Sequence, residues 1–124
     1  MNLYRMLLQR EADDEPLRVG LIGAGKFGSM FLSQVRKTAG MHLLAVADLR
    51  PDQARESLKR VGFKASELKA KSFEAALRSR QCFVTDDAMA LIQSTSIDIV
   101  IDATGSPAAG IQHVLACCEY GKHI

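Results

Sequence analysis

Three glycines within residues 19–31, VGLIGAGKFGSMF, have the spacing of a phosphate-binding turn. Gly23, Gly25 and Gly28 form the pattern GxGxxG between an apolar run and apolar residues at helical spacing. In a strand–turn–helix unit, the first glycine permits the tight turn and the second lets the backbone approach a pyrophosphate. The third lets the helix pack closely on the strand. The helix start then offers free N–H groups and a positive dipole end to phosphates. By itself the pattern also fits a turn that merely packs.

An acidic residue lies at the distance that dinucleotide binding requires. Asp48 comes 20 residues after Gly28 and closes the apolar run MHLLAVAD. A carboxylate at the end of a second strand accepts hydrogen bonds from the adenosine ribose hydroxyls. The combination of glycines, strand, helix and acid therefore predicts a bound dinucleotide. Arg50 leaves NAD and NADP open, because it either pairs with a 2′-phosphate or is a solvent-exposed residue beside Pro51.

The segment DATGSP, residues 102–107, follows a later apolar run. In a doubly wound sheet, ligands bind outside the carboxyl ends of the strands near the switch point. We therefore expect Ala103, Thr104 and Gly105 to lie where the cofactor passes, with a donor hydroxyl on Thr104. We interpret Asp102 as a structural or capping acid rather than a catalytic one.

The other reactive side chains have structural interpretations. Asp86 and Asp87 open a helix, which favours a capping role. We expect His42, at a strand start, and His113, within a helix, to be structural or exposed. The basic residues between positions 55 and 80 predict a solvated face. The three cysteines are odd in number and lack a CxxC pair, so they predict reduced, mostly buried thiols rather than disulfides or a metal site.

Apolar runs of strand length alternate with amphipathic segments along the chain. This alternation predicts an α/β fold, a Rossmann-type doubly wound parallel sheet with helices on both faces. We expect strands at residues 17–22, 41–48, 82–85 and 97–105, and the first residues of a fifth strand at 122–124. We expect helices at residues 1–10, from the glycines to a stop at Gly40, at 51–62, within 63–80, at 87–94 with Thr85 or Asp86 as cap, and at 107–121.

Length and charge limit the other possibilities. The 124 residues suffice for one domain, here a helix and linker at 1–16 and a dinucleotide-binding domain at 17–124. Because domains rarely stop inside a buried strand, we expect a fragment of a longer chain, truncated at its fifth strand. A net charge of +2 gives no argument for a nucleic-acid or membrane partner. Without a signal peptide or a long apolar run, we expect a cytoplasmic protein.

Several stretches resemble the N-terminal half of a bacterial oxidoreductase family. This family is described as homoserine-dehydrogenase-like with a C-terminal SAF domain, and it includes an enzyme similar in activity to 1-deoxy-D-xylulose 5-phosphate reductoisomerase. A related Rossmann family, of the glucose–fructose oxidoreductase type, has a similar GKHI-like turn followed by a lysine-bearing motif. The stretches that carry the resemblance are NLYRMLLQRE, RVGLIGAGKFGSMFLSQV, HLLAVADLRPDQAR, VTDD, IDIVIDATGSPAAGIQH and GKHI.

The resemblance implies an NAD(P)H-dependent reductase or reductoisomerase that uses NADPH or NADH. It implies a small carbonyl or alcohol substrate, a homo-oligomeric full-length protein, and a later catalytic domain that holds the catalytic residues and a divalent metal. No catalytic residue is assigned in this chain. The alternatives are a non-catalytic NAD(H)-binding regulatory module and a domain that binds S-adenosylmethionine. The resemblance places the cofactor on Gly23, Gly25, Lys26, Phe27, Gly28, Asp48, Arg50, Thr104 and Gly105, and their neighbours Ala24, Leu49 and Ala103 complete the candidate set.

Overall fold

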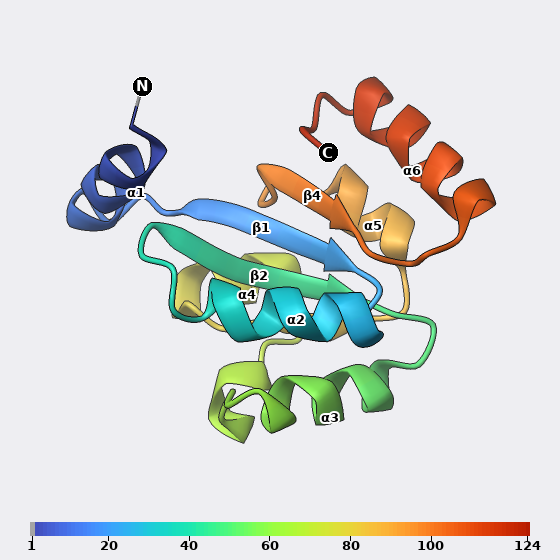
Figure 1. Ribbon diagram of the computed structural model, residues 1–124, viewed down its shortest axis with the longest axis horizontal. Helices are drawn as coiled ribbons and strands as arrows, with labels where there is room; N and C mark the ends of the chain where they lie inside the picture. Colours follow the sequence, from blue (N-terminus) through green and yellow to red (C-terminus); the bar gives the residue numbers. More distant parts are fainter. Residues whose placement is uncertain (1) are drawn as a thin grey trace.

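A four-stranded parallel sheet forms the centre of the chain (Figure 1). The computed structural model describes residues 2–124. The strands lie in the order β3-β2-β1-β4. The chain thus passes from β1 to β2 and β3 on one side, and then crosses over to β4 on the other side of β1. The switch point therefore lies between β1 and β4. The predicted Rossmann-type fold is confirmed. The strands are β1 (Leu17–Ile22), β2 (Met41–Ala47), β3 (Phe83–Thr85) and β4 (Ile99–Asp102).

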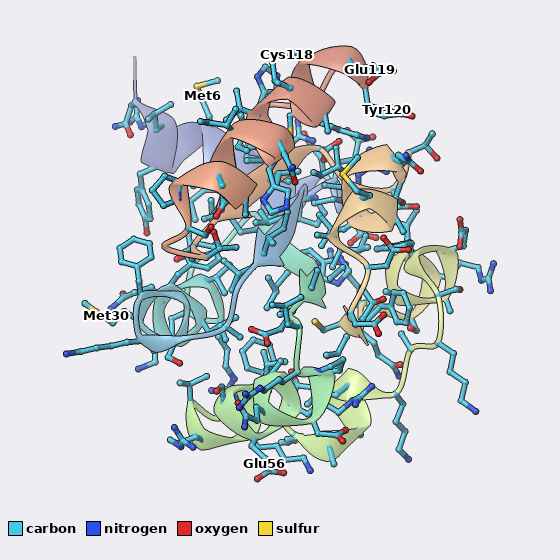
Figure 2. All side chains as sticks on the ribbon, turned by 90° about the vertical axis from the view of Figure 1, so that its right-hand side faces the viewer. Met6, Met30, Glu56, Cys118, Glu119 and Tyr120 are labelled. Carbon is cyan, nitrogen blue, oxygen red and sulfur yellow. The ribbon has the colours of Figure 1, made fainter. Side chains whose placement is uncertain are left out.

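Helices cover both faces of the sheet. Helices α2 and α3 pack on the front face in Figure 1, while α4, α5 and α6 pack on the back face. Figure 2 shows Met30 and Glu56 on the outer sides of α2 and α3. The helical segments are α1 (Leu3–Ala12), α2 (Lys26–Val35), α3 (Pro51–Arg60), the 3-10 turn η1 (Ala65–Leu68), α4 (Phe73–Ser79), α5 (Ala88–Gln93) and α6 (Pro107–Glu119).

Because both faces are covered, the strands are apolar at almost every position. In β1, Leu21 packs on the face of α2 and α3, and Ile22 packs on the opposite face. The register between β1 and β2 shifts after Val19, where Leu44 is inserted as an extra residue. Leu44 and Ala45 consequently belong to the same apolar cluster although they are consecutive. Beyond this shift Ile22 pairs with Ala47, and the N–H of Gly23 donates to the Ala47 carbonyl at 2.8 Å.

Two predicted helices have different bounds in the structure. Helix α2 ends at Val35, five residues before the expected stop at Gly40. Gly40 instead has φ +80° and contacts the backbone of Leu7 so closely that a Cβ would overlap it. Residues 63–80 form η1 and α4 rather than one helical segment, because the Ser72 hydroxyl accepts from the N–H of Ala75 and starts α4 afresh.

Smaller corrections concern caps and strand ends. Asp87, not Thr85 or Asp86, caps α5 by accepting from the N–H of Ala90 at 2.9 Å. Strand β4 begins at Ile99, not at residue 97, because the preceding Asp98 turns toward Arg18. The last residues form a single parallel bridge between Ile99 and His123, so among residues 2–124 this segment pairs with β4 without forming a strand.

The amino ends of the strands are closed by contacts with α1 and its linker. A Glu11 carboxylate oxygen accepts from the N–H of Gly40 at 2.8 Å, and the N–H of Leu17 donates to the Gly40 carbonyl at 2.7 Å. The Arg18 guanidinium donates to both oxygens of Asp98, at 3.0 and 2.7 Å. The Glu11 contact holds the predicted N-terminal helix against the amino ends of the strands, opposite the glycine turn, and the other two contacts join β1 to the segments that precede β2 and β4.

Across the described part of the chain, no helix is both long and apolar enough to span a bilayer. All three cysteines are free thiols there, Cys82 and Cys117 buried and Cys118 exposed at the end of α6 (Figure 2). Burial raises the pKa of the Cys82 thiol to about 12, so this side chain acts as a core residue rather than a nucleophile.

Candidate functional site

The three motif glycines occupy distinct environments between β1 and α2. Gly23 has φ +93°, and a Cβ there would lie 2.9 Å from the backbone of Ala103 and from the Thr104 nitrogen. A Cβ on Gly28 would overlap the carbonyl oxygen of Gly23, so α2 can approach the turn only with glycine at this position. Gly25 differs from both, because no atom lies within 4 Å of the position of its absent Cβ. The first and third glycines thus serve packing, and the second leaves open space.

The start of α2 faces this open space without a side-chain cap. Gly25 is the N-cap residue, and no side chain accepts a hydrogen bond from the first turn. The first intrahelical bond runs from the N–H of Ser29 to the Gly25 carbonyl at 2.8 Å. The preceding N–H groups, including those of Lys26 and Phe27, therefore remain available, and they lie at the positive end of the helix dipole. This arrangement suits an anionic group such as a phosphate.

Asp48 joins the end of β2 to the glycine turn. One carboxylate oxygen accepts from the N–H of Ala24 at 2.8 Å, and the other accepts from the N–H of Arg50 at 2.8 Å. A carboxylate offers about four lone-pair sites, so each oxygen retains capacity for a further donor. Asp48 therefore fixes the shape of the turn and still presents acceptors to a ligand.

A second acidic residue organises the turn after β4. One oxygen of Asp102 accepts from the N–H and hydroxyl of Thr104, at 2.9 and 2.8 Å. Its other oxygen lies 2.6 Å from Nδ1 of His113 on α6. Burial opposes ionisation of Asp102, but the hydrogen bonds from Thr104 and His113 outweigh it and lower the pKa of the carboxyl.

These two turns and the end of β3 surround a cavity of about 410 Å³ at the carboxyl ends of the strands. A second, shallower cavity of about 770 Å³ runs between α2 and α3 and includes Lys26, Asp48 and Arg60. The first cavity is lined by Ile22, Gly23, Gly25, Ala47, Asp48, Leu49, Asp86, Ala88, Ala103, Thr104, Ser106, Ala109 and His113.

Comparison with known proteins agrees with this geometry. Residues 17–124 match the family described as GFO/IDH/MocA, an oxidoreductase family with an NAD-binding Rossmann fold. The chain belongs to this family. The match supports the dinucleotide-binding and oxidoreductase parts of the predicted resemblance, and it corresponds to the glucose–fructose oxidoreductase type. It does not test the homoserine-dehydrogenase-like, reductoisomerase-like or SAF-domain parts.

Among solved structures, this GFO/IDH/MocA domain is similar to levoglucosan dehydrogenase in a complex with NADH and L-sorbose. The two chains are 26% identical with a TM-score of 0.60, and the alignment covers 88% of this chain and 26% of the dehydrogenase. The chain thus spans about a quarter of the length of that enzyme. No curated relative matches significantly.

Most of the predicted site residues of this NAD-binding domain lie at the carboxyl ends of the strands. The 410 Å³ cavity includes Gly23, Gly25, Asp48, Leu49, Ala103 and Thr104, and the second cavity includes Ala24 and Lys26. Phe27 is exposed in the first turn of α2. Arg50 is the exposed N-cap residue of α3 and makes its contact with Asp48 through the backbone. Gly105 borders a neighbouring groove beside α6.

Sequence reasoning missed two residues of the cavity wall. Asp86 lines the cavity rather than capping α5. His113 is buried, as a structural histidine would be, yet it lines the same cavity and is paired with Asp102. A signal was present, because His113, Ala116 and Cys117 form the buried stripe of α6 at helical spacing. That stripe places the imidazole on the sheet side of the helix.

Among residues 2–124, no three His, Cys, Asp or Glu side chains gather into a potential metal site.

Proposed function

We propose that this chain is the cofactor-binding part of an NAD(P)-dependent dehydrogenase or reductase. The observation that carries the proposal is the convergence of three features at one cavity. The open space beside Gly25, the uncapped start of α2 and the Asp48 carboxylate all lie at the carboxyl ends of the strands. In open α/β sheets, ligands bind outside the carboxyl ends of the strands at the switch point.

In this proposal the pyrophosphate lies against Gly25 and the first turn of α2, where N–H groups are free. Asp48 accepts from the adenosine ribose hydroxyls with the lone pairs that Ala24 and Arg50 leave unused. The nicotinamide half of the cofactor extends past Thr104 and Gly105 into the groove beside α6, which does not include His113. When bound, the cofactor supplies the hydride, and these residues position it.

We infer a small carbonyl or alcohol compound as the substrate. The similar dehydrogenase was solved with L-sorbose, a compound of this class, and this supports the inference. The finer alternatives are a ketose phosphate, as in a reductoisomerase-like enzyme, and an amino-acid-derived aldehyde, as in a homoserine-dehydrogenase-like enzyme. These rest on the sequence resemblance alone, as do the homo-oligomer and the SAF domain. The catalytic residues and a divalent metal would belong to a further domain.

Arg50 is the proposed determinant of cofactor preference. Its backbone is fixed by Asp48, and its exposed side chain begins α3 next to the ribose acid. If the guanidinium pairs with a 2′-phosphate, Arg50→Ala weakens NADPH binding by about tenfold and leaves NADH binding nearly unchanged. Dissociation constants for the two cofactors, measured in parallel, test this role. Equal effects on both would refute it.

The proposed function is tested by titrating the full-length protein, including the further domain proposed above, with NADH and NADPH and following nicotinamide fluorescence. We expect saturable binding of at least one of them, and oxidation of that cofactor in the presence of a small carbonyl substrate. Absence of a saturable signal with either cofactor would contradict the proposal. Saturable binding without turnover on any carbonyl or alcohol substrate would instead favour a regulatory NAD(H)-binding module.

A further inference from the structure

His113 lies in the part of the cavity that would receive the base of the cofactor. The cavity wall includes residues from the ends of β2 and β3, and Asp48 marks the position of the adenosine ribose. The base attached to that ribose would therefore occupy the space toward α6. The surrounding side chains of Leu49, Ala88 and Ala109 are apolar and suit the faces of a flat ring.

The contacts of Asp102 determine which nitrogen of His113 carries the proton. An ionised carboxylate only accepts hydrogen bonds, so the 2.6 Å contact requires a proton on Nδ1 of His113. In the neutral ring Nε2 then has a free lone pair. Nε2 makes no hydrogen bond to any of residues 2–124, and the ring lines the cavity. The imidazole thus offers an acceptor to a ligand, fixed by a partner outside the cavity.

We propose that His113, oriented by Asp102, selects adenine by accepting a hydrogen bond from its 6-amino group. The Asp86 carboxylate, on the same cavity, adds a second acceptor. Adenine presents a donor at position 6, whereas guanine and hypoxanthine present a 6-oxo acceptor. Two acceptors in the wall therefore favour adenine and disfavour 6-oxo purines. This inference rests on the proposed function and names the positioning residue, Asp102, and the base-reading residue, His113.

Asp102→Asn provides a sharp test because it should reverse the proton position on His113. Thr104 donates twice to one oxygen of Asp102, so the Asn carbonyl would retain that place. The Asn amide nitrogen would then face Nδ1 of His113 and donate to it. Nδ1 becomes an acceptor, the proton moves to Nε2, and the cavity gains a donor that suits a 6-oxo purine.

The experiment compares NADH with reduced nicotinamide hypoxanthine dinucleotide, in which a 6-oxo group and an N1–H replace the 6-amino group and the bare N1 of adenine. For the wild-type protein we expect the hypoxanthine cofactor to bind at least about fivefold more weakly. The reason is that the acceptors of His113 and Asp86 would face the 6-oxo oxygen, which is itself an acceptor. In Asp102→Asn the ratio of dissociation constants should fall to about 1 or invert. Nitrogen-15 NMR of the histidine ring should show the proton on Nδ1 in the wild type and on Nε2 in the variant.

Asp13→Asn, at the far end of the sheet on the exposed C-cap of α1, is the matched control and should keep the wild-type ratio. If Asp102→Asn does not fold, His113→Phe removes one of the two acceptors and should lower the ratio toward 1. Tight NADH binding by the wild type without discrimination between the two purines would overturn the inference and leave the proposed function intact. An unchanged ratio in a folded Asp102→Asn protein would also overturn it. Failure of the wild type to bind NADH would overturn both.

Discussion

The two ends of the parallel sheet use similar side chains in opposite ways. At the amino ends, Asp98 receives three hydrogen bonds from Arg18, two from the guanidinium and one from the backbone. At the carboxyl ends, Asp48 accepts from two backbone N–H groups, and Asp102 accepts from Thr104 and from a histidine; of these partners, Ala24, Thr104 and His113 line cavities there. The acid at the amino ends closes an ion pair, whereas the acids at the carboxyl ends shape turns and keep acceptors free. Arg18 and Asp98 also line a cavity, of about 460 Å³, so the distinguishing feature is the free acceptors. We propose that the amino ends of the strands stabilise the sheet and that the carboxyl ends bind the cofactor.

Within the glycine turn, Gly28 serves packing and Gly25 faces open space, so substitutions at the two positions should have different effects. Gly28→Ala would place a Cβ onto the Gly23 carbonyl oxygen, and we expect it to lower the free energy of unfolding by about 3 kcal/mol. Gly25→Ala meets no atom within 4 Å, so its stability should stay within about 1 kcal/mol of the wild type while NADH affinity falls. Urea unfolding and NADH titration of both variants measure the two effects. Equal losses of stability would contradict the division of roles.

The amino edge is tested by Asp98→Asn. The substitution removes the charge that pairs with Arg18, and we expect the free energy of unfolding to fall by about 2 kcal/mol. Because Asp98 lies at the end of the sheet away from the cavity, the NADH dissociation constant of the folded protein should not change. Urea unfolding with a parallel NADH titration checks both expectations. A loss of affinity with unchanged stability would reverse the assignment of the two edges.

The smallest expected effect is a pH dependence that originates at the amino edge. Burial lowers the pKa of His42 from its ordinary value of 6.5, a shift that the carbonyl of Gln81 opposes and Arg80 reinforces. The unfolded chain therefore binds a proton that the folded chain does not, and stability falls as the pH drops below about 6.5. For one proton the slope is at most about 1.4 kcal/mol per pH unit.

Urea unfolding between about pH 7.5 and pH 5.5 measures this slope, and His42→Gln should flatten it. Asp98→Asn should keep the slope, because hydrogen bonds from Arg18 outweigh burial and hold the pKa of Asp98 below its ordinary 3.8. That carboxylate contributes stability that is lost only as the pH falls through still more acidic values. A wild-type curve that is flat across this range would contradict the assignment to His42.

Sequence patterns that span only a few residues predicted most of the fold. The apolar runs and glycines predicted all four strands, and Pro107 marked the start of α6, because these signals act within a few residues. The end of α2 could not be read in this way. Gly40 is glycine because the backbone of Leu7 approaches it from α1, a contact between segments far apart in the sequence. The break between η1 and α4 was likewise hidden, since both halves have helical composition.

The candidate site also contains residues that sequence spacing predicts and residues that depend on packing between distant segments. Asp48 was predicted because its distance from Gly28 is part of a recurrent strand–helix–strand unit. The pairing of Asp102 with His113 depends on how α6 packs on β4, and the role of Asp86 depends on which residue caps α5. Neither follows from spacing along the chain. Spacing along the chain therefore suffices to propose residues for the phosphates and the ribose, whereas the residues proposed for the base needed the structure.

The central claim is that the cofactor binds at the carboxyl ends of the strands and not at the amino ends. It is tested most directly by finding which backbone amide signals shift when NADH is added. Two-dimensional nitrogen–proton NMR spectra would be recorded during a titration of the isotopically labelled protein. We predict that shifts concentrate at residues 23–29, 48–50 and 103–106, while Leu17, Gly40 and Asp98 stay unchanged. Shifts that gather around Arg18 and Gly40, with none at Gly25, would contradict the account.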